Sequence, residues 1–214
     1  MFISLLFKNP EYYSMWLLIV IFSICTHEYM HARVALWQGD ATAADQGHLT
    51  LNPLKQMGGF SLVMLIVVGI AWGSVPVDSS KMKHKYSDVL VAAAGPLTNF
   101  ALFFVFSILY GVAIGIGYKH IGAESASLET AKTLCNIGGI LNFVLFVFNL
   151  LPVPGLDGWH VVCRLFPSLR TKTPQLFMFF SVVLLLLVIS FFQYLFSAGQ
   201  IATGLIAHLG YKII

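Results

Sequence analysis

Residues 12–37 read YYSMWLLIVIFSICTHEYMHARVALW, an apolar run of 26 residues. As an α-helix rising 1.5 Å per residue, this run is about 39 Å long, which is enough to cross roughly 30 Å of bilayer hydrocarbon. The run is too long for a cleaved signal peptide, and Lys8 is the only lysine or arginine ahead of it. The sequence therefore predicts that this segment is a membrane-spanning helix.

The composition of the whole chain also indicates a membrane protein. Of its 214 residues, 58% are hydrophobic and 10% are charged, against roughly 45–50% and about 25% in soluble domains. The three cysteines are odd in number and widely spaced, which excludes a disulfide scaffold. The net charge of +3 is too small to indicate nucleic-acid binding. We expect an all-α polytopic protein that lies in a lipid bilayer and binds no nucleic acid.

Further apolar tracts bring the expected number of transmembrane helices to roughly four to six. A second span is predicted at about residues 89–117, interrupted near its start by Gly95 and Pro96. A third is predicted at about residues 133–151. The C-terminal tract, at about residues 175–207, is long enough for one tilted span or for two short ones. The sequence leaves that choice open.

The segment between the first two spans is predicted to enter the membrane without crossing it. Residues 59–72 form an apolar stretch of only 14 residues, which is short for a spanning helix and favours a re-entrant or interfacial element. Residues 46–51 alternate weakly, so a short β-like edge is a second possibility after the first span.

Basic residues predict the orientation of the chain. Lys81, Lys83 and Lys85 follow the re-entrant segment, and further basic residues lie between residues 153 and 174. Cytoplasmic loops carry an excess of lysine and arginine, so both connections are expected on the cytoplasmic side of the cell (inner) membrane. The two spans predicted between them agree with this arrangement.

An HExxH pattern, His27-Glu28-Tyr29-Met30-His31, lies inside the first span. On a helix His27 and His31 are one turn apart on the same face, so both can bind one metal ion, and Glu28 lies beside them to take a proton from water. Ionisable groups within a span cost several kcal/mol each unless they are paired or hydrated. Three of them within five residues therefore favour a metal site over polar contacts that only hold helices together.

A catalytic zinc ion needs a third protein ligand and an open position for water. The best candidate is Asp157 in NLLPVPGLDG, residues 149–158, where two prolines and two glycines unwind the backbone. The alternative is an aspartate that caps a helix at the membrane interface. If residues 59–72 do not cross, the first and third spans are parallel, and His27, His31 and Asp157 reach the same depth.

Together these motifs resemble the site-2 protease family of intramembrane zinc metalloproteases. The resemblance implies one Zn²⁺ per chain, held by His27, His31 and Asp157, with Glu28 as general base. The chain looks like a compact member of the family, without PDZ or CBS domains. It departs from the family pattern at His48, where similar members often have arginine. The matching segments run in order from residue 27 to residue 158: HEYMH (27–31), GD (39–40), LTLNPLK (49–55), WGSVPV (72–77), AGPLTN (94–99) and NLLPVPGLDG (149–158).

The resemblance also places Asn99 and Asn149 near the site, where their amides could bind an unwound substrate or the oxyanion. Asn142 shares a helical face with Asn149, and we expect it to hydrogen-bond between helices. The implied function is hydrolysis of peptide bonds within transmembrane segments of membrane proteins, in regulated intramembrane proteolysis, at a site toward the cytoplasmic side. The alternatives are a zinc-binding membrane chaperone or transporter without protease activity, and a purely structural metal site.

We expect a single intramembrane metalloprotease domain over residues 1–214. Its metal-site core would occupy about residues 12–158, followed by the C-terminal membrane helices at about residues 175–207. The expected partners are a transmembrane protein or peptide substrate and the lipid bilayer. The sequence predicts neither the physiological substrate nor the oligomeric state.

Overall fold

The computed structural model describes residues 2–119, 125–166 and 174–213, and the regular secondary structure of these residues is all helical, with no β-strand among them. The prediction of an all-α protein is therefore confirmed. The helices are α1 (Ser4–Lys8), α2 (Pro10–Trp37), α3 (Thr42–Asp45), α4 (Pro53–Gln56), α5 (Gly58–Val68), the 3₁₀ helix η1 (Ser79–Lys81), α6 (Ser87–Lys119), α7 (Ala126–Asn149), α8 (Asp157–Leu165) and α9 (Pro174–Tyr211).

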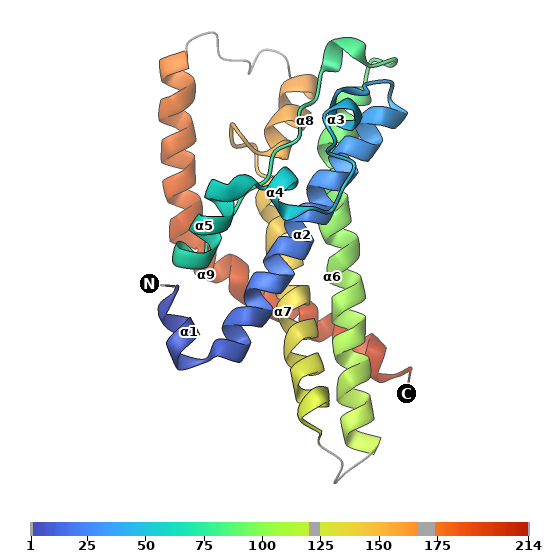
Figure 1. Ribbon diagram of the computed structural model, residues 1–214, viewed down its shortest axis with the longest axis vertical. Coiled ribbons are helices and arrows are strands. Elements are labelled where there is room, and N and C mark those ends of the chain that lie inside the picture. The colour runs from blue at the N-terminus through green and yellow to red at the C-terminus, as the bar shows by residue number, and fades with distance from the viewer. Residues whose placement is uncertain (1, 120–124, 167–173, 214) are drawn as a thin grey trace.

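Three of the described helices, α2, α6 and α7, are long and apolar enough to cross a membrane. This number is lower than the four to six that the sequence predicts. The C-terminal tract forms one continuous helix, α9, of 38 residues, and Figure 1 shows that it changes direction partway along its length. Large apolar side chains on α2 and α6 are exposed, among them Leu18, Phe22, Leu97 and Val105. Such surfaces belong in lipid, and the protein is an integral membrane protein.

One detail of the predicted elements is wrong, and one alternative that the sequence left open does not occur. Gly95 and Pro96 do not interrupt the second span, because α6 continues through Pro96 as one helix. Proline is tolerated inside membrane helices because neighbouring groups compensate for the hydrogen bond that it lacks. Residues 46–51 form turns and bends instead of a strand, since the amide of His48 bonds back to the carbonyl of Ala43 at 2.9 Å.

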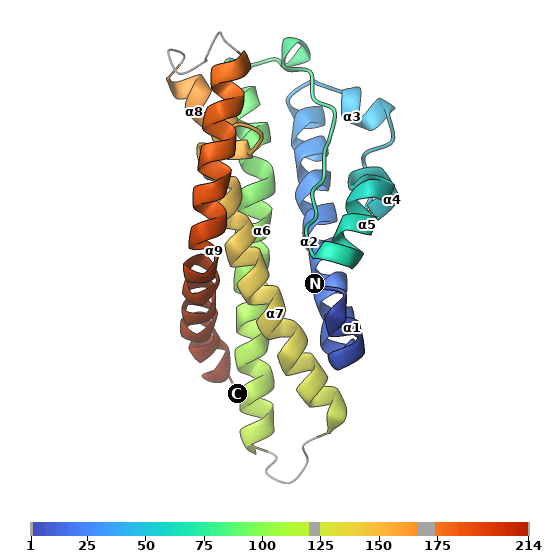
Figure 2. The ribbon, with the colours of Figure 1, turned by 90° about the vertical axis from the view of Figure 1, so that its left-hand side faces the viewer.

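The segment between α2 and α6 returns to the end of the molecule from which it left. At that end, the amide of Lys83 donates to the carbonyl of Gln38 at 2.9 Å, and the hydroxyl of Ser87 donates to the Gln38 side chain at 2.7 Å. Helix α5, with 11 residues, is about 16 Å long at 1.5 Å per residue and is too short to cross. Figure 2 shows α3, α4 and α5 stacked along one side of α2.

As a result, α2 and α7 run parallel to one another, with α6 antiparallel to both (Figures 1 and 2). Near their starts, the hydroxyl of Thr130 on α7 donates to the carboxylate of Glu11 on α2 at 2.7 Å. Between them, apolar side chains form a core that includes Ile19 and Ile24 of α2 and Leu141 of α7. This packing fixes the first half of α2 and brings its second half beside the end of α7.

Candidate metal centre

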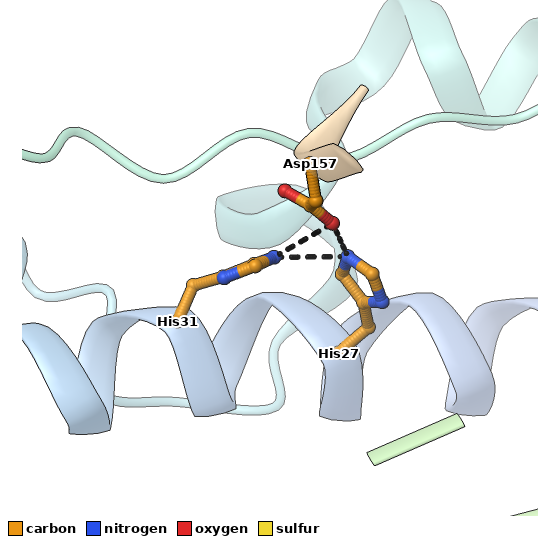
Figure 3. Close-up of side chains that lie close together, drawn as sticks. All are labelled: His27, His31 and Asp157. Carbon is orange, nitrogen blue, oxygen red and sulfur yellow. Dashed lines mark hydrogen bonds and ion pairs between the residues drawn. The ribbon is translucent and has the colours of Figure 1, made fainter. Parts of the chain in front are cut away.

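Two histidines and one aspartate converge at the end of α2 that faces α8. The Nε2 atoms of His27 and His31 are 3.0 Å apart, and Oδ2 of Asp157 is 3.1 Å from the first and 3.3 Å from the second. Figure 3 shows the three side chains pointing toward a common point from α2 and from the start of α8. The helical spacing predicts the histidine pair, and the parallel course of α2 and α7 brings in Asp157.

Hydrogen bonds on the far side of each ring determine which nitrogen carries the proton. Nδ1 of His31 is 2.6 Å from the carbonyl oxygen of Val91, and Nδ1 of His27 is 2.6 Å from Oδ1 of Asn99. Both oxygens are acceptors, so both Nδ1 atoms donate and both Nε2 atoms are left with a lone pair. The three atoms that meet in the site are therefore all electron-pair donors, with no proton between them.

Such a group of donors fits a metal cation. Around a tetrahedral zinc ion with bonds of about 2.0–2.1 Å, neighbouring ligand atoms lie about 3.3 Å apart, close to the separations described above. Within the described parts of the chain, Oδ2 of Asp157 is buried and has no hydrogen-bond donor. Without a cation the three donors repel one another. His27, His31 and Asp157 can therefore hold a metal ion, and they leave positions for a water molecule or a substrate oxygen.

Gly95 on α6 closes the other side of the histidine pair. A Cβ atom on residue 95 would lie 2.3 Å from Nε2 of His31 and 2.4 Å from Nε2 of His27. Any side chain at this position would occupy the space of the ligand atoms and of a bound metal ion. The glycine therefore keeps open the cradle in which the ion would lie.

The sharp turn after α7 brings Asp157 into the site. The chain leaves α7 at Asn149, passes Gly155 with a φ of +97°, and starts α8 at Asp157 itself. A Cβ atom on Gly158 would lie 2.2 Å from the carbonyl oxygen of Leu150, so only glycine allows the turn to close this tightly. The carboxylate at the first position of α8 thus points back toward α2.

Glu28 lies next to the ligands and under an extended segment, residues 70–78, that we name the strap. Glu28 is 8% exposed and faces the same cavity as the ligand pair. Gly73 of the strap is in contact with the Glu28 side chain. Two hydrogen bonds between Ser61 and Trp72, of 2.7 Å and 2.9 Å, anchor one end of the strap to α5. At the other end, the amide of Asp78 donates to Oδ2 of Asp40 at 2.6 Å.

A cavity of about 720 Å³ contains the site. One wall is the strap, and the opposite wall comes from the end of α7, the following turn and α8. The cavity therefore has the size and the mixed polar lining of a substrate site. Besides the ligands, its lining includes Glu28, Val75, Asn99, Asn149 and His160.

The remaining residues predicted from the sequence lie at different distances from the ligands. Asn99 contacts His27 directly, and Asn142 contacts Asn99 at 3.0 Å. Asn149 lines the cavity, and its amide donates to the carbonyl of Leu145 one turn back on its own helix. His48 lies instead beside Gln56, whose side chain donates to the His48 carbonyl at 2.8 Å. The sequence alone does not predict the closeness of Gly73 and Gly95 to the site.

The chain matches the sequence pattern of Peptidase family M50 over residues 15–190. It is 37% identical to "Putative zinc metalloprotease YwhC" of Bacillus subtilis (strain 168) over 174 residues, which are 80% of this chain and 78% of that protein. It is 30% identical to "Putative zinc metalloprotease Rip2" of Mycolicibacterium smegmatis over 179 residues, 77% of this chain and 62% of that protein. The Rip2 protein of Mycobacterium tuberculosis H37Rv is 31% identical over 160 residues, 72% of this chain and 56% of the relative.

The chain thus spans less than two thirds of the length of the Rip2 proteins. No solved structure matches the chain. The family pattern nevertheless covers most of the sequence, and the clustered His27, His31 and Asp157 offer the donor atoms of a zinc site. This chain belongs to peptidase family M50, the site-2 protease family of membrane zinc metalloproteases, and its cofactor is Zn²⁺.

Proposed function

We propose that this protein is an intramembrane endopeptidase that hydrolyses peptide bonds within the transmembrane segments of membrane proteins. The observation that carries the proposal is the position of the ligand group within the length of a spanning helix. His31 is six residues before Trp37, the last residue of α2, so the ligands lie about 9 Å or more inside the end of the helix at 1.5 Å per residue. A scissile bond bound there would lie inside the bilayer.

In this proposal His27, His31 and Asp157 hold the zinc ion. When bound, the ion supplies Lewis acidity, which polarises a peptide carbonyl and makes water more acidic. Glu28 accepts a proton from the attacking water while the water oxygen forms its bond to the carbonyl carbon. When the C–N bond breaks, Glu28 gives that proton to the leaving nitrogen. Its burial beside Gly73 keeps the carboxylate in one position for both transfers.

The cavity favours a substrate that has lost its helical structure. An amide inside an intact helix is shielded and hydrogen-bonded, so it must unwind before attack. The strap forms no helix, strand or turn where it lines the cavity at Val75 and Val77, and Figure 2 shows it running along α2 as an extended trace. Its backbone N–H and C=O groups can pair with an extended segment in the manner of an added strand. Asn149, which also lines the cavity, is a candidate to bind such a substrate or the oxyanion.

The basic residues support a site that opens toward the cytoplasmic side of the cell (inner) membrane. Lys81, Lys83 and Lys85 lie between the strap and α6, and Arg164 of α8 forms an ion pair with Asp88 of α6 at 3.5 Å. These charges are at the end of the molecule where α2 finishes and α8 begins, which is the end nearest to the ligands. The bias of lysine and arginine toward the cytoplasm then gives the orientation.

The competing function is that of a zinc-binding membrane chaperone or transporter without hydrolysis. Such a protein would not need the Glu28 carboxylate beside the zinc ligands, because it would not have to move a proton from water. The test uses purified protein in liposomes with a single-span test substrate, and it compares wild type with Glu28→Gln. A matched control is Glu11→Gln, which makes the same change at the exposed start of the same helix.

We expect wild type and Glu11→Gln to cleave the substrate within its span, and Glu28→Gln to retain zinc without cleaving. Substrates with glycine or asparagine in the span near the depth of the site should be cleaved faster than a uniform leucine span, because they unwind more readily. Cleavage mapped by mass spectrometry to an exposed loop, or wild-type activity of Glu28→Gln, would contradict the proposal.

A further inference from the structure

Two buried asparagines connect the ligand His27 to α7. Oδ1 of Asn99 is 2.6 Å from Nδ1 of His27, and Nδ2 of Asn99 donates to Oδ1 of Asn142 at 3.0 Å. Nδ2 of Asn142 in turn donates to the carbonyl oxygen of Gly138 at 2.9 Å. Both asparagines are 0% exposed, so water does not compete for these contacts. The series of hydrogen bonds therefore runs from α2 through α6 to the backbone of α7.

The Gly138 carbonyl, at the end of this series, determines which atom donates in each of the hydrogen bonds. The carbonyl oxygen of Gly138 can only accept, so Asn142 must present its NH₂ group there and its oxygen to Asn99. Asn99 must then present its NH₂ group to Asn142 and its oxygen to His27. Nδ1 of His27 therefore carries the proton, and Nε2 faces the metal site with a lone pair.

Ser23 of α2 supplies a second partner for the NH₂ group of each asparagine. Its hydroxyl accepts from Nδ2 of Asn142 at 2.9 Å, and its carbonyl accepts from Nδ2 of Asn99 at 3.5 Å. Each NH₂ group thus faces two acceptors, one for each hydrogen. A half-turn of Asn99 would bring its oxygen against the Ser23 carbonyl and the Asn142 oxygen, and a half-turn of Asn142 would bring its oxygen against the Gly138 carbonyl. The orientation of both amides is fixed by the packing of three helices.

We propose that Asn99 and Asn142 form an amide relay that holds His27 in the tautomer required to bind the metal ion. This inference rests on the proposed function only in taking His27 as a zinc ligand. His31 needs no relay, because its Nδ1 faces the backbone carbonyl of Val91 directly. Asn99 is then a positioning residue that acts through His27, and Asn142 acts through Asn99.

The relay is tested first by zinc affinity, measured by competition with a chromophoric chelator. Asn99→Leu removes the acceptor for His27, and groups of this kind typically change metal affinity by about 10–100-fold. We expect a loss of that size for Asn99→Leu and a smaller one for Asn142→Leu, which leaves Asn99 in contact with His27 but less firmly oriented. Asn136→Leu, on the same helix as Asn142 but outside the series, should bind zinc as wild type does.

A second pair of measurements separates positioning from packing. Asn99→Asp keeps an oxygen for His27, but its second oxygen loses the hydrogen bonds to Asn142 and to the Ser23 carbonyl. It should therefore bind zinc more tightly than Asn99→Leu and more weakly than wild type. In metal-free wild type, ¹⁵N chemical shifts should show the proton of His27 on Nδ1. In Asn99→Leu both tautomers should be present. If Asn99→Leu does not fold, the aspartate variant and the wild-type spectrum still decide the question.

Zinc affinity of folded Asn99→Leu within twofold of wild type would overturn the relay, as would a wild-type spectrum with the proton on Nε2. These outcomes differ from a failure of the proposed function. A wild-type protein that binds zinc but cleaves no substrate would remove the protease and leave the relay in place. A wild-type protein that binds no zinc would overturn both.

Discussion

Gly73 and Glu28 are in direct contact, although they lie 45 positions apart in the sequence. A Cβ atom on residue 73 would be 2.4 Å from Cγ of Glu28 and 2.5 Å from its Oε1. The strap can lie over the proposed general base only because residue 73 has no side chain. The contact links the wall of the cavity to the group that would move protons.

Gly73→Ala should therefore lower activity without removing the metal ion. The added methyl group must displace either the strap or the Glu28 carboxylate, and a misplacement of about 1 Å at a reacting group costs on the order of 100-fold in rate. We expect kcat/KM to fall by about that factor while the zinc content stays near one per chain. Gly59→Ala serves as the control, because a Cβ atom there meets nothing within 4 Å. Wild-type cleavage by Gly73→Ala would contradict the close contact.

Gly95→Ala, unlike Gly73→Ala, should lower the zinc content of the protein. Its Cβ atom would overlap the Nε2 atoms of both His27 and His31, so the two rings could not keep their present separation. We expect zinc content, measured by atomic emission after gel filtration, to fall well below one per chain. Gly204→Ala on α9, where a Cβ atom has open space, should keep its zinc. Full zinc occupancy in Gly95→Ala would show that the cradle is not where the ion lies.

Asp40 should make the attachment of the strap dependent on pH. Burial raises the pKa of this carboxyl, but hydrogen bonds from Thr42 and from the amide of Asp78 outweigh burial and hold the pKa below its ordinary value. The hydrogen bonds between Asp40 and the strap are therefore at full strength when the pH is above the ordinary aspartate pKa of about 4. They weaken as the pH falls through the lower pKa that Asp40 has in the folded protein. Hydrogen–deuterium exchange of residues 72–86, corrected for the intrinsic rate at each pH, should accelerate in that range.

Asp40→Asn should show faster exchange in the strap already at pH 7. The amide side chain offers one acceptor where the carboxylate offers two, and a hydrogen bond to a charged group contributes about 1.5–3 kcal/mol. A loss at the lower end of that range raises the population of detached strap more than tenfold. Asp45→Asn, at an exposed position on α3, is the control. Equal exchange in both variants would show that Asp40 does not hold the strap.

The proposed orientation can be tested by labelling single cysteines in a protein without Cys25, Cys135 and Cys163. Lys83→Cys and Leu165→Cys should react with an impermeant maleimide from the cytoplasmic side, and Ser125→Cys should react from the other side. Lys83 and Leu165 lie at the basic end of the molecule, and Ser125 lies at the start of α7 at the opposite end. Reaction of Lys83→Cys and Leu165→Cys from opposite sides would overturn the arrangement of the spans.

The sequence predicts those parts of the site that depend on local periodicity and on length. His27 and His31 face the same way because they are one helical turn apart, and Asp157 joins them because residues 59–72 are too few to cross the membrane. The interruption at Pro96 was wrong because packing in the membrane stabilises a helix that proline would weaken in water. The β-like edge that the sequence left possible at residues 46–51 does not form, because the chain closes a local turn there.

Contacts across helices could not be predicted in the same way. The bond between Asn99 and His27 depends on how far α6 is rotated about its own axis against α2. Successive residues of a helix point in directions 100° apart. The sequence of one helix does not indicate which of these directions faces the neighbouring helix. The same holds for Gly73 and Gly95, which look like ordinary turn and helix glycines until the opposing side chains are placed. The sequence predicts that Asn99 lies near the site, but it does not predict that Asn99 contacts His27.

The late position of Asp157 in the chain has a consequence during biosynthesis. A nascent chain that has been made only as far as α7 carries the histidine pair and Glu28 but not the carboxylate at the start of α8. Two imidazoles hold zinc far less firmly than a complete set of three ligands. On the proposed ligand set, the growing polypeptide would therefore lack a complete zinc site while α2 and α6 insert. On that ligand set, we expect the zinc site to be complete only after the turn beyond α7 has been synthesised and has folded back against α2.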